Sequence, residues 1–207
     1  MADAVGVVIS AAVEGLVDEA VARRLIALVG ATPGPVYGKS GKAYLRQRIA
    51  GYNNAARHSP WLVLVDLDSD AACAPPLLAA WLPMPAPYIS FRVAVRETEA
   101  WLLADAQHLA AFLRIACSRI PRDPESLDNP KNTLVELARH SRSRSVREDM
   151  VPRPASGRPV GPAYVSRLIE FVSGPSALWR PETAARRSDS LNRCLIGLRR
   201  LARFTSI

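Results

Sequence analysis

The stretch Trp-Leu-Val-Leu-Val-Asp-Leu-Asp-Ser-Asp at positions 61–70 decides the fold that we expect for this chain. It begins with five apolar residues after Pro60 and ends with acids at alternate positions, Asp66, Asp68 and Asp70. A short continuous apolar run with such borders predicts a strand buried on both faces, as in a parallel sheet. If the strand continues to Asp68, the first two carboxylates project together from its carboxyl end, where open α/β sheets bind ligands. The alternative is a polar turn that follows a buried strand.

Strand-like and helix-like segments alternate on both sides of this stretch. Apolar runs rich in β-branched and aromatic residues predict four strands, at 5–13, near 36–37, at 61–66 and at 88–96. Helical spacing follows each of them, at about 18–29, 43–57, 76–81 and from 100 onward. This alternation predicts an α/β fold with a mostly parallel four-stranded sheet, joined by right-handed crossovers and flanked by helices. We expect this domain to occupy residues 1–117.

The sequence changes character after residue 117, because prolines interrupt it repeatedly as far as residue 162. Helical spacing is recognisable at three places, 131–140, 162–173 and 189–204. We therefore expect residues 118–207 to form a basic helical extension that packs on the first domain. The run Ser-Arg-Ser-Arg-Ser-Val-Arg at 141–147 is expected to be mobile. It is equally consistent with a nucleic-acid contact and with a disordered loop.

Positive charge is concentrated in the second half of the chain. The formal net charge is +8, and residues 1–100 contain nine basic and nine acidic residues, so the whole excess lies beyond residue 100. A neutral half with acidic strand ends beside a basic half suits a polyanionic substrate and a metal ion. The alternative is a solvated surface encoded by a genome that favours arginine, alanine and proline.

Three further features favour a cytoplasmic protein that does not interact with membranes. No stretch of 18 or more uncharged apolar residues is present, so no membrane span is expected. The start of the chain lacks the basic region of a secretory signal. The cysteines, Cys73, Cys117 and Cys194, are scattered and odd in number, which is typical neither of a disulfide framework nor of a zinc site.

Acids also follow two other predicted strands. Glu14 comes directly after the first strand, and Glu97 and Glu99 come after the fourth. Because the carboxyl ends of parallel strands lie on one edge of the sheet, these acids are expected to meet the aspartates of 66–70 there. Mg²⁺ and Mn²⁺ prefer such oxygen ligands, and a cation relieves the repulsion between adjacent carboxylates. The pattern therefore predicts a divalent metal site with phosphoryl chemistry.

These motifs resemble a known family of nucleic-acid enzymes. The segments Val-Glu-Gly-x-x-Asp-Glu at 13–19 and Val-Asp-Leu-Asp-x-Asp at 65–70 are similar to the TOPRIM domain. The segment at 95–105, with Glu-x-Glu-Ala-Trp-Leu-Leu-Ala-Asp, resembles the TOPRIM-like DUF4276 family, and the tail at 179–191 resembles that group as well. The group is itself similar to the nuclease domain of OLD-family proteins.

The resemblance implies a Mg²⁺- or Mn²⁺-dependent nuclease that cleaves DNA or RNA. It implies catalytic roles for Glu14, Asp66, Asp68 and Lys131, the last as a clamp on the phosphate. The alternative for Lys131 is a solvated lysine in a first helical turn. The implied metal ligands are Glu14, Asp66, Asp68, Asp70, Glu97 and Glu99. OLD proteins carry an ATPase in the same chain, and this chain has none, so the resemblance implies a separate ATPase subunit in a phage-defence system.

Basic residues outside this constellation are candidates for contacts with nucleic acid, namely Lys39, Lys42, Arg142 and Arg144. The glycines around Lys39 do not have the spacing of a nucleotide-binding P-loop. The acids also lack the Asp-x-Asp-Gly-Thr motif of haloacid-dehalogenase phosphatases. A non-catalytic subunit of the same fold, which binds nucleic acid or an ATPase, is the alternative function. The sequence leaves open whether the chain forms a homo-oligomer.

Overall fold

The computed structural model describes residues 6–176 and 178–203, and its internal contacts divide the chain into two compact units. The first, here called the sheet unit, runs to Ala94 and resumes at Asn192. The second, here called the helical unit, comprises Val95–Leu191. Each unit is described by itself.

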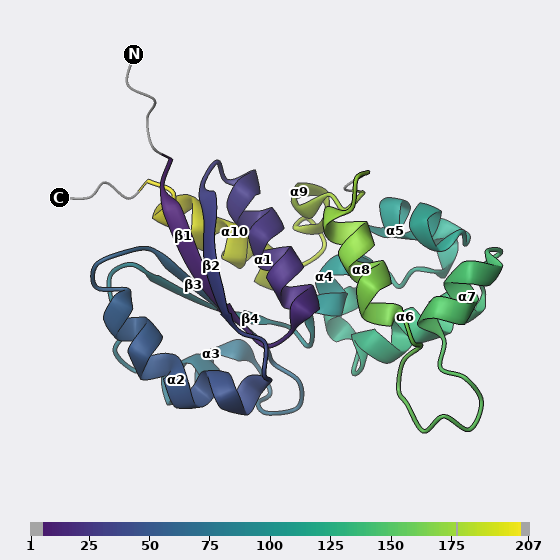
Figure 1. The fold of residues 1–207 in the computed structure, drawn as a ribbon, viewed down its shortest axis with the longest axis horizontal. Coiled ribbons are helices and arrows are strands. Elements are labelled where there is room, and N and C mark those ends of the chain that lie inside the picture. The colour runs from purple at the N-terminus through teal and green to yellow at the C-terminus, as the bar shows by residue number, and fades with distance from the viewer. Residues whose placement is uncertain (1–5, 177, 204–207) are drawn as a thin grey trace, which may run out of the picture. The chain divides into compact units, whose positions relative to one another are not determined.

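The sheet unit confirms the predicted α/β fold with a four-stranded, entirely parallel sheet. The strands are β1 (Val8–Val13), β2 (Thr32–Gly38), β3 (Trp61–Asp66) and β4 (Ile89–Ala94), in the spatial order β2-β1-β3-β4. The helices that connect them are α1 (Leu16–Leu28), α2 (Lys42–Ala55) and α3 (Ala74–Trp81). The chain returns to this unit in α10 (Asp189–Leu201), which belongs to it from Asn192 onward. Figure 1 shows α1 and α10 on one side of the sheet and α2 and α3 on the other.

Strand β3 forms the buried centre of the sheet, as its apolar run predicts. All five residues from Trp61 to Val65 are buried, and β3 pairs with β1 on one side and β4 on the other. The strand ends at Asp66, and Asp68 lies in a left-handed turn with φ 50°. The two carboxylates therefore do not share one face of an extended strand. The expectation that the strand continues to Asp68 was therefore wrong. The chain turns after Leu67, and the Asp70 N–H donates back to the Leu67 carbonyl (3.2 Å).

The two edges of the sheet are protected in different ways. Strand β2 contains Pro33 and Pro35, which lack the N–H group that another strand would need for pairing. Against β4 lies α10, where Gly197 approaches Ser90 and Arg92 so closely that a Cβ atom would collide with both side chains. In addition, the Arg200 guanidinium donates to the Ile89 carbonyl (3.2 Å). The C-terminal helix is therefore an integral part of the sheet unit.

The helical unit is built around the short helix α4. Its helices are α4 (Thr98–Ala104), α5 (Ala106–Leu113), α6 (Pro130–Arg139), α7 (Arg144–Met150), α8 (Tyr164–Ser173) and α9 (Pro181–Ala184), with the 3₁₀ turns η1 (Cys117–Arg119) and η2 (Pro124–Ser126). Every residue of α4 is buried. The Trp101 indole donates to the Ser190 hydroxyl (2.7 Å), and the Trp179 indole donates to the Trp101 carbonyl (3.4 Å). Two buried tryptophans thus fix α4 at the centre of this unit.

The boundary that we expected at residue 117 lies inside the helical unit, at the start of η1. Helix α4 packs against η2, α6 and α9, so the residues that follow β4 associate with the helices downstream of them. The prediction of a mobile segment at 141–147 was wrong over most of its length. Helix α7 begins at Arg144, the Ser143 hydroxyl caps it, and Val146 and Met150 are buried.

Within the described part of the chain, none of the helices is long and apolar enough to cross a membrane.

Candidate functional site

The carboxyl ends of β1 and β3 bring together two of the predicted acids. Glu14 follows the last residue of β1, and Asp66 is the last residue of β3. The Asp66 backbone N–H donates to Glu14 Oε1 (2.9 Å), although 52 positions separate the two residues. In the sheet, β2 lies on one side of β1 and β3 lies on the other. The chain therefore reverses its direction across the sheet between β1 and β3. Open α/β sheets bind ligands at the carboxyl ends of strands at such a reversal.

The Glu14 carboxyl group has an unusual affinity for protons. Its pKa is raised from the ordinary value of 4.5 to about 7, mainly by burial, with smaller contributions from the charges of Asp18 and Asp68. The hydrogen bond from Asp66 and the positive charge of Lys42 oppose this effect without cancelling it. Near neutral pH this carboxyl group is therefore divided between its protonated and ionised forms, and a nearby cation would favour the ionised one.

A lysine lies against the other acids of the opening motif. Lys42, in the first turn of α2, places its Nζ 2.5 Å from Asp68 Oδ2 and 2.8 Å from Asp70 Oδ2. Burial alone would lower the pKa of Lys42, but the hydrogen bonds to the two aspartates and the charge of Glu14 raise it overall. Lys42 was predicted as a nucleic-acid contact, and its role beside these acids was missed. The available signal was its position after β2, whose carboxyl end lies on the same edge as Glu14.

The remaining charged residues of this edge have identifiable structural partners. Asp18 is buried and accepts a hydrogen bond from the Gly15 N–H (2.9 Å), which fixes the start of α1. Glu19 pairs with Lys39 (3.0 Å) and Arg23 (2.9 Å). Lys39, a predicted nucleic-acid contact, therefore has an acidic neighbour within its own unit.

The helical unit brings together a second set of predicted residues. Lys131, in the first turn of α6, places its Nζ 3.0 Å from Glu97 Oε1 and 3.5 Å from Glu99 Oε1. Its backbone N–H also donates to Glu97 Oε2 (2.8 Å). Glu99 is only 4% exposed and accepts a hydrogen bond from the Tyr164 hydroxyl (3.3 Å). Glu97, Glu99 and Lys131, all named as site residues from the sequence, thus lie together in this unit.

Tyr164 is the member of this cluster that sequence reasoning missed. It opens α8, and burial followed by the charges of Glu99 and Glu97 raises its pKa, so its hydroxyl remains a hydrogen-bond donor. No local pattern connects Tyr164 with Glu99, because 65 positions separate them. Its partnership with Glu99 arises only from the packing of α8.

Several predicted residues lie apart from both clusters. Arg144 pairs with Glu148 (2.7 Å) along α7, and the Arg142 backbone N–H donates to the Arg114 carbonyl. Glu14 and Asp66 belong to the sheet unit, whereas Glu97 and Glu99 belong to the helical unit, so the convergence of these two pairs stays a prediction.

The chemistry of the first cluster fits a hard divalent cation. Glu14, Asp66, Asp68 and Asp70 offer carboxylate oxygens, which Mg²⁺ and Mn²⁺ prefer as ligands. Among residues 6–176 and 178–203, no group of three or more His, Cys, Asp or Glu side chains is arranged so that it could hold a metal ion. A cation that bound Asp68 Oδ2 would compete with the Lys42 ammonium group, which lies 2.5 Å from that oxygen.

Comparison of the chain with protein-family models, with curated proteins and with solved structures gives no match. The TOPRIM-like resemblance therefore stays an interpretation of the sequence motifs. The geometry of the two clusters carries the functional argument.

Proposed function

We propose that this protein is a Mg²⁺- or Mn²⁺-dependent nuclease of the TOPRIM-like type, which hydrolyses phosphodiester bonds of DNA or RNA. The observation that carries the proposal is the pairing of Glu14 with Asp66 at the carboxyl ends of β1 and β3. These two acids lie where the strand order reverses, which is the usual ligand site of an open α/β sheet.

The residues of the sheet unit would hold the cation. Glu14, Asp66 and Asp68 are the proposed ligands, with Asp70 assisting. When bound, the cation would polarise the phosphate and make a water molecule easier to deprotonate. The alternative role for Glu14 is that of a general base that does not bind the cation directly, and its pKa of about 7 in the metal-free protein suits that role near neutral pH.

The residues of the helical unit would serve the same reaction. Glu99 is the proposed ligand for a second cation, and Glu97 would assist it. Tyr164 and Lys131 both contact Glu99 Oε1, at 3.3 Å and 3.5 Å, so this oxygen is positioned before any ligand arrives. The Lys131 ammonium would bind a phosphate oxygen of the substrate.

The basic second half of the chain and the resemblance to OLD nucleases extend the proposal to partners and location. Eighteen basic and ten acidic residues beyond residue 100 favour a polyanionic substrate. We place the protein in the cytoplasm, together with a separate ATPase subunit of a phage-defence system.

A cleavage assay with labelled DNA and RNA, in Mg²⁺ and in Mn²⁺, tests the proposal. The protein is assayed alone and with any ATPase that is encoded next to it. The variant Asp66→Ala/Asp68→Ala should lose cleavage. The control Asp123→Ala/Asp128→Ala removes two exposed acids of the helical unit and should cleave like the wild type. Equal cleavage by the wild type and Asp66→Ala/Asp68→Ala would refute the assignment.

Calorimetric titration with Mn²⁺ separates this proposal from the alternative of a non-catalytic subunit. A nuclease site predicts binding of Mn²⁺ that Asp66→Ala/Asp68→Ala abolishes. A subunit that only binds nucleic acid or an ATPase predicts no binding of Mn²⁺ by the wild type.

A further inference from the structure

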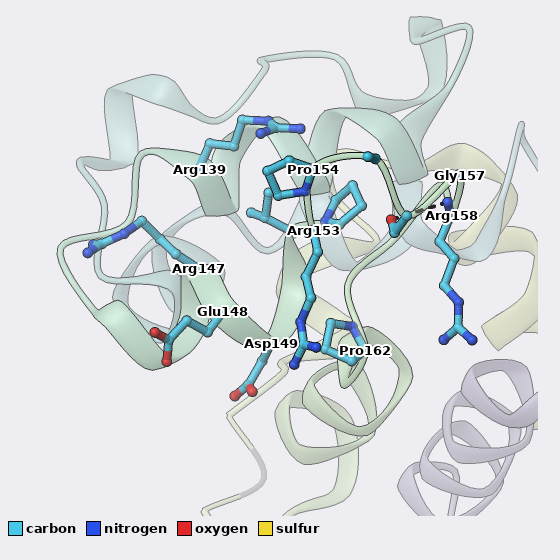
Figure 2. A pocket seen from close by; sticks show the side chains of 13 residues that line it. Arg139, Arg147, Glu148, Asp149, Arg153, Pro154, Gly157, Arg158 and Pro162 are labelled. Carbon is cyan, nitrogen blue, oxygen red and sulfur yellow. Dashed lines mark hydrogen bonds between the residues drawn. The ribbon is translucent and has the colours of Figure 1, made fainter.

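Several arginines gather around the loop between α7 and α8. A cavity of about 1220 Å³ lies between this loop, residues 151–163, and the helices α6 and α7. Four arginines line it, namely Arg139, Arg147, Arg153 and Arg158 (Figure 2). They come from three separate segments of the chain, so the fold gathers them around one space.

The loop has a defined conformation that depends on specific residues. Its ends are joined by hydrogen bonds from the Gly161 N–H to the Met150 carbonyl and from the Ala163 N–H to the Asp149 carbonyl, both 2.9 Å. A Cβ atom at Gly161 would collide with the Asp149 carbonyl oxygen, so this closure requires glycine. Prolines at 152, 154, 159 and 162 restrict the backbone between these points. The loop is thus a preorganised support for side chains.

The tip of the loop presents two arginines on either side of a tight turn. The Ser156 N–H donates to the Arg153 carbonyl (3.1 Å), and Ala155 and Gly157 have positive φ angles of 59° and 65°. The Arg158 N–H donates to the Ser156 hydroxyl (3.3 Å). Arg153 and Arg158 are both exposed, and Figure 2 shows their side chains extending away from the turn.

Of the four arginines that line the cavity, Arg139 pairs with Glu136 (3.0 Å), whereas the two acids that also line it, Glu148 and Asp149, pair with arginines outside it. Glu148 pairs with Arg144 (2.7 Å) and Asp149 pairs with Arg167 (2.7 Å), and neither of these arginines lines the cavity. Residues 139–162 contain six arginines, no lysine and two acids, which gives a formal charge of +4, half that of the whole chain. The cavity is therefore a strongly positive surface.

The use of arginine alone indicates the kind of ligand. A guanidinium group is planar, is more weakly hydrated than an ammonium group and matches two phosphate oxygens at once. The prolines beside the arginines provide apolar surface against which sugars and bases can pack. We propose that the cavity under the α7–α8 loop binds the phosphodiester backbone of nucleic acid. The choice of nucleic acid over another polyanion rests on the function proposed above.

Fluorescence anisotropy with labelled oligonucleotides tests this site without any cleavage. Single-stranded DNA and RNA of the same sequence are titrated with protein in EDTA over a series of salt concentrations. Arg153→Gln/Arg158→Gln should weaken binding by about tenfold and reduce the salt slope of log K by about 2, because two phosphate contacts are lost. The control Arg119→Gln/Arg186→Gln removes the same charge at exposed positions outside the cavity and should bind like the wild type.

Two results would overturn the proposal. One is equal binding by the loop variant and the control variant. The other is displacement of the oligonucleotide by polyglutamate as readily as by unlabelled oligonucleotide of equal charge, which would indicate an acidic protein partner. Circular dichroism and thermal unfolding of the loop variant establish that it is folded.

The design also separates a failure of this site from a failure of the proposed nuclease. If both proposals hold, the loop variant raises KM with kcat unchanged, whereas Asp66→Ala/Asp68→Ala binds the oligonucleotide in EDTA but does not cleave it. If only the loop site exists, binding in EDTA still depends on Arg153 and Arg158 and no metal produces cleavage. If only the nuclease exists, the loop variant binds and cleaves like the wild type.

Discussion

Neutralising Glu14 should stabilise the metal-free protein, although Glu14 is a proposed functional residue. In Glu14→Gln the side chain keeps the Oε1 atom that accepts the Asp66 N–H and loses only its ability to ionise. The folded-state pKa of Glu14 is about 7, compared with an ordinary value of 4.5. The folded protein therefore binds this proton more tightly than the unfolded chain does, and stability falls as the pH rises from about 4.5 through about 7.

The size of the effect follows from the same two values. The difference corresponds to about 3 kcal/mol in favour of the protonated folded state, reduced to about 2 kcal/mol because the residue is only partly buried. Glutamine is neutral at every pH, so it avoids this cost. Glu14→Gln should therefore exceed the wild type in stability by about 2 kcal/mol at pH 8.5 and match it near pH 4.

Urea unfolding in EDTA, followed by tryptophan fluorescence at both pH values, measures the difference. The control is Glu19→Gln, because Lys39 and Arg23 lower the pKa of the Glu19 carboxyl and its neutralisation should not stabilise the protein at pH 8.5. A Glu14→Gln variant that is no more stable than the wild type at pH 8.5, or whose gain is the same at both pH values, would refute the reasoning. Addition of Mn²⁺ should then stabilise the wild type and Glu19→Gln more than Glu14→Gln, since ligands stabilise the state that binds them.

Three further perturbations test other parts of the structure. Lys42→Met should tighten Mn²⁺ binding by up to about fivefold in calorimetry, because an ammonium group no longer competes for Asp68. The control Lys39→Met should leave the affinity for Mn²⁺ unchanged, and weaker Mn²⁺ binding by Lys42→Met would contradict the prediction. Tyr164→Phe should lower stability by about 2 kcal/mol in thermal unfolding, and the loss should shrink in a Glu99→Gln background if the hydrogen bond is responsible. Gly38→Ala should lower the free energy of unfolding in urea by about 3 kcal/mol, since φ is 91° and a Cβ atom would strike the Val13 carbonyl. The control is Gly51→Ala at an open helical position, and a Gly38→Ala variant as stable as Gly51→Ala would contradict the prediction.

The sequence predicted those parts of the fold that depend on local pattern. Strand β3 was predicted at 61–66 and is observed as Trp61–Asp66, because a continuous apolar run between Pro60 and acids has few other solutions. The pairing of Glu14 with Asp66 also followed, since parallel strands place their carboxyl ends on one edge.

Long-range packing decided what the sequence did not predict. Lys42 contacts Asp68 because the chain turns away from β3 earlier than expected. Tyr164 contacts Glu99 because the start of α8 lies against α4, although 65 positions separate the two residues. Helix α7 was missed because serine and arginine dominate its start, whereas its stability depends on the Ser143 cap and on two buried apolar residues. These interactions have no periodic signature in the sequence.

The return of the chain to β4 in α10 has a consequence for how the protein is made and dissected. The sheet unit is interrupted after Ala94 and completed only from Asn192, so its last covering helix is synthesised after the entire helical unit. Truncation at residue 117 would expose the surface of β4 that contacts Gly197, and such a fragment should aggregate. To isolate a stable sheet unit, residues 95–191 should be replaced by a short linker. This deletion keeps both segments of the sheet unit in one chain.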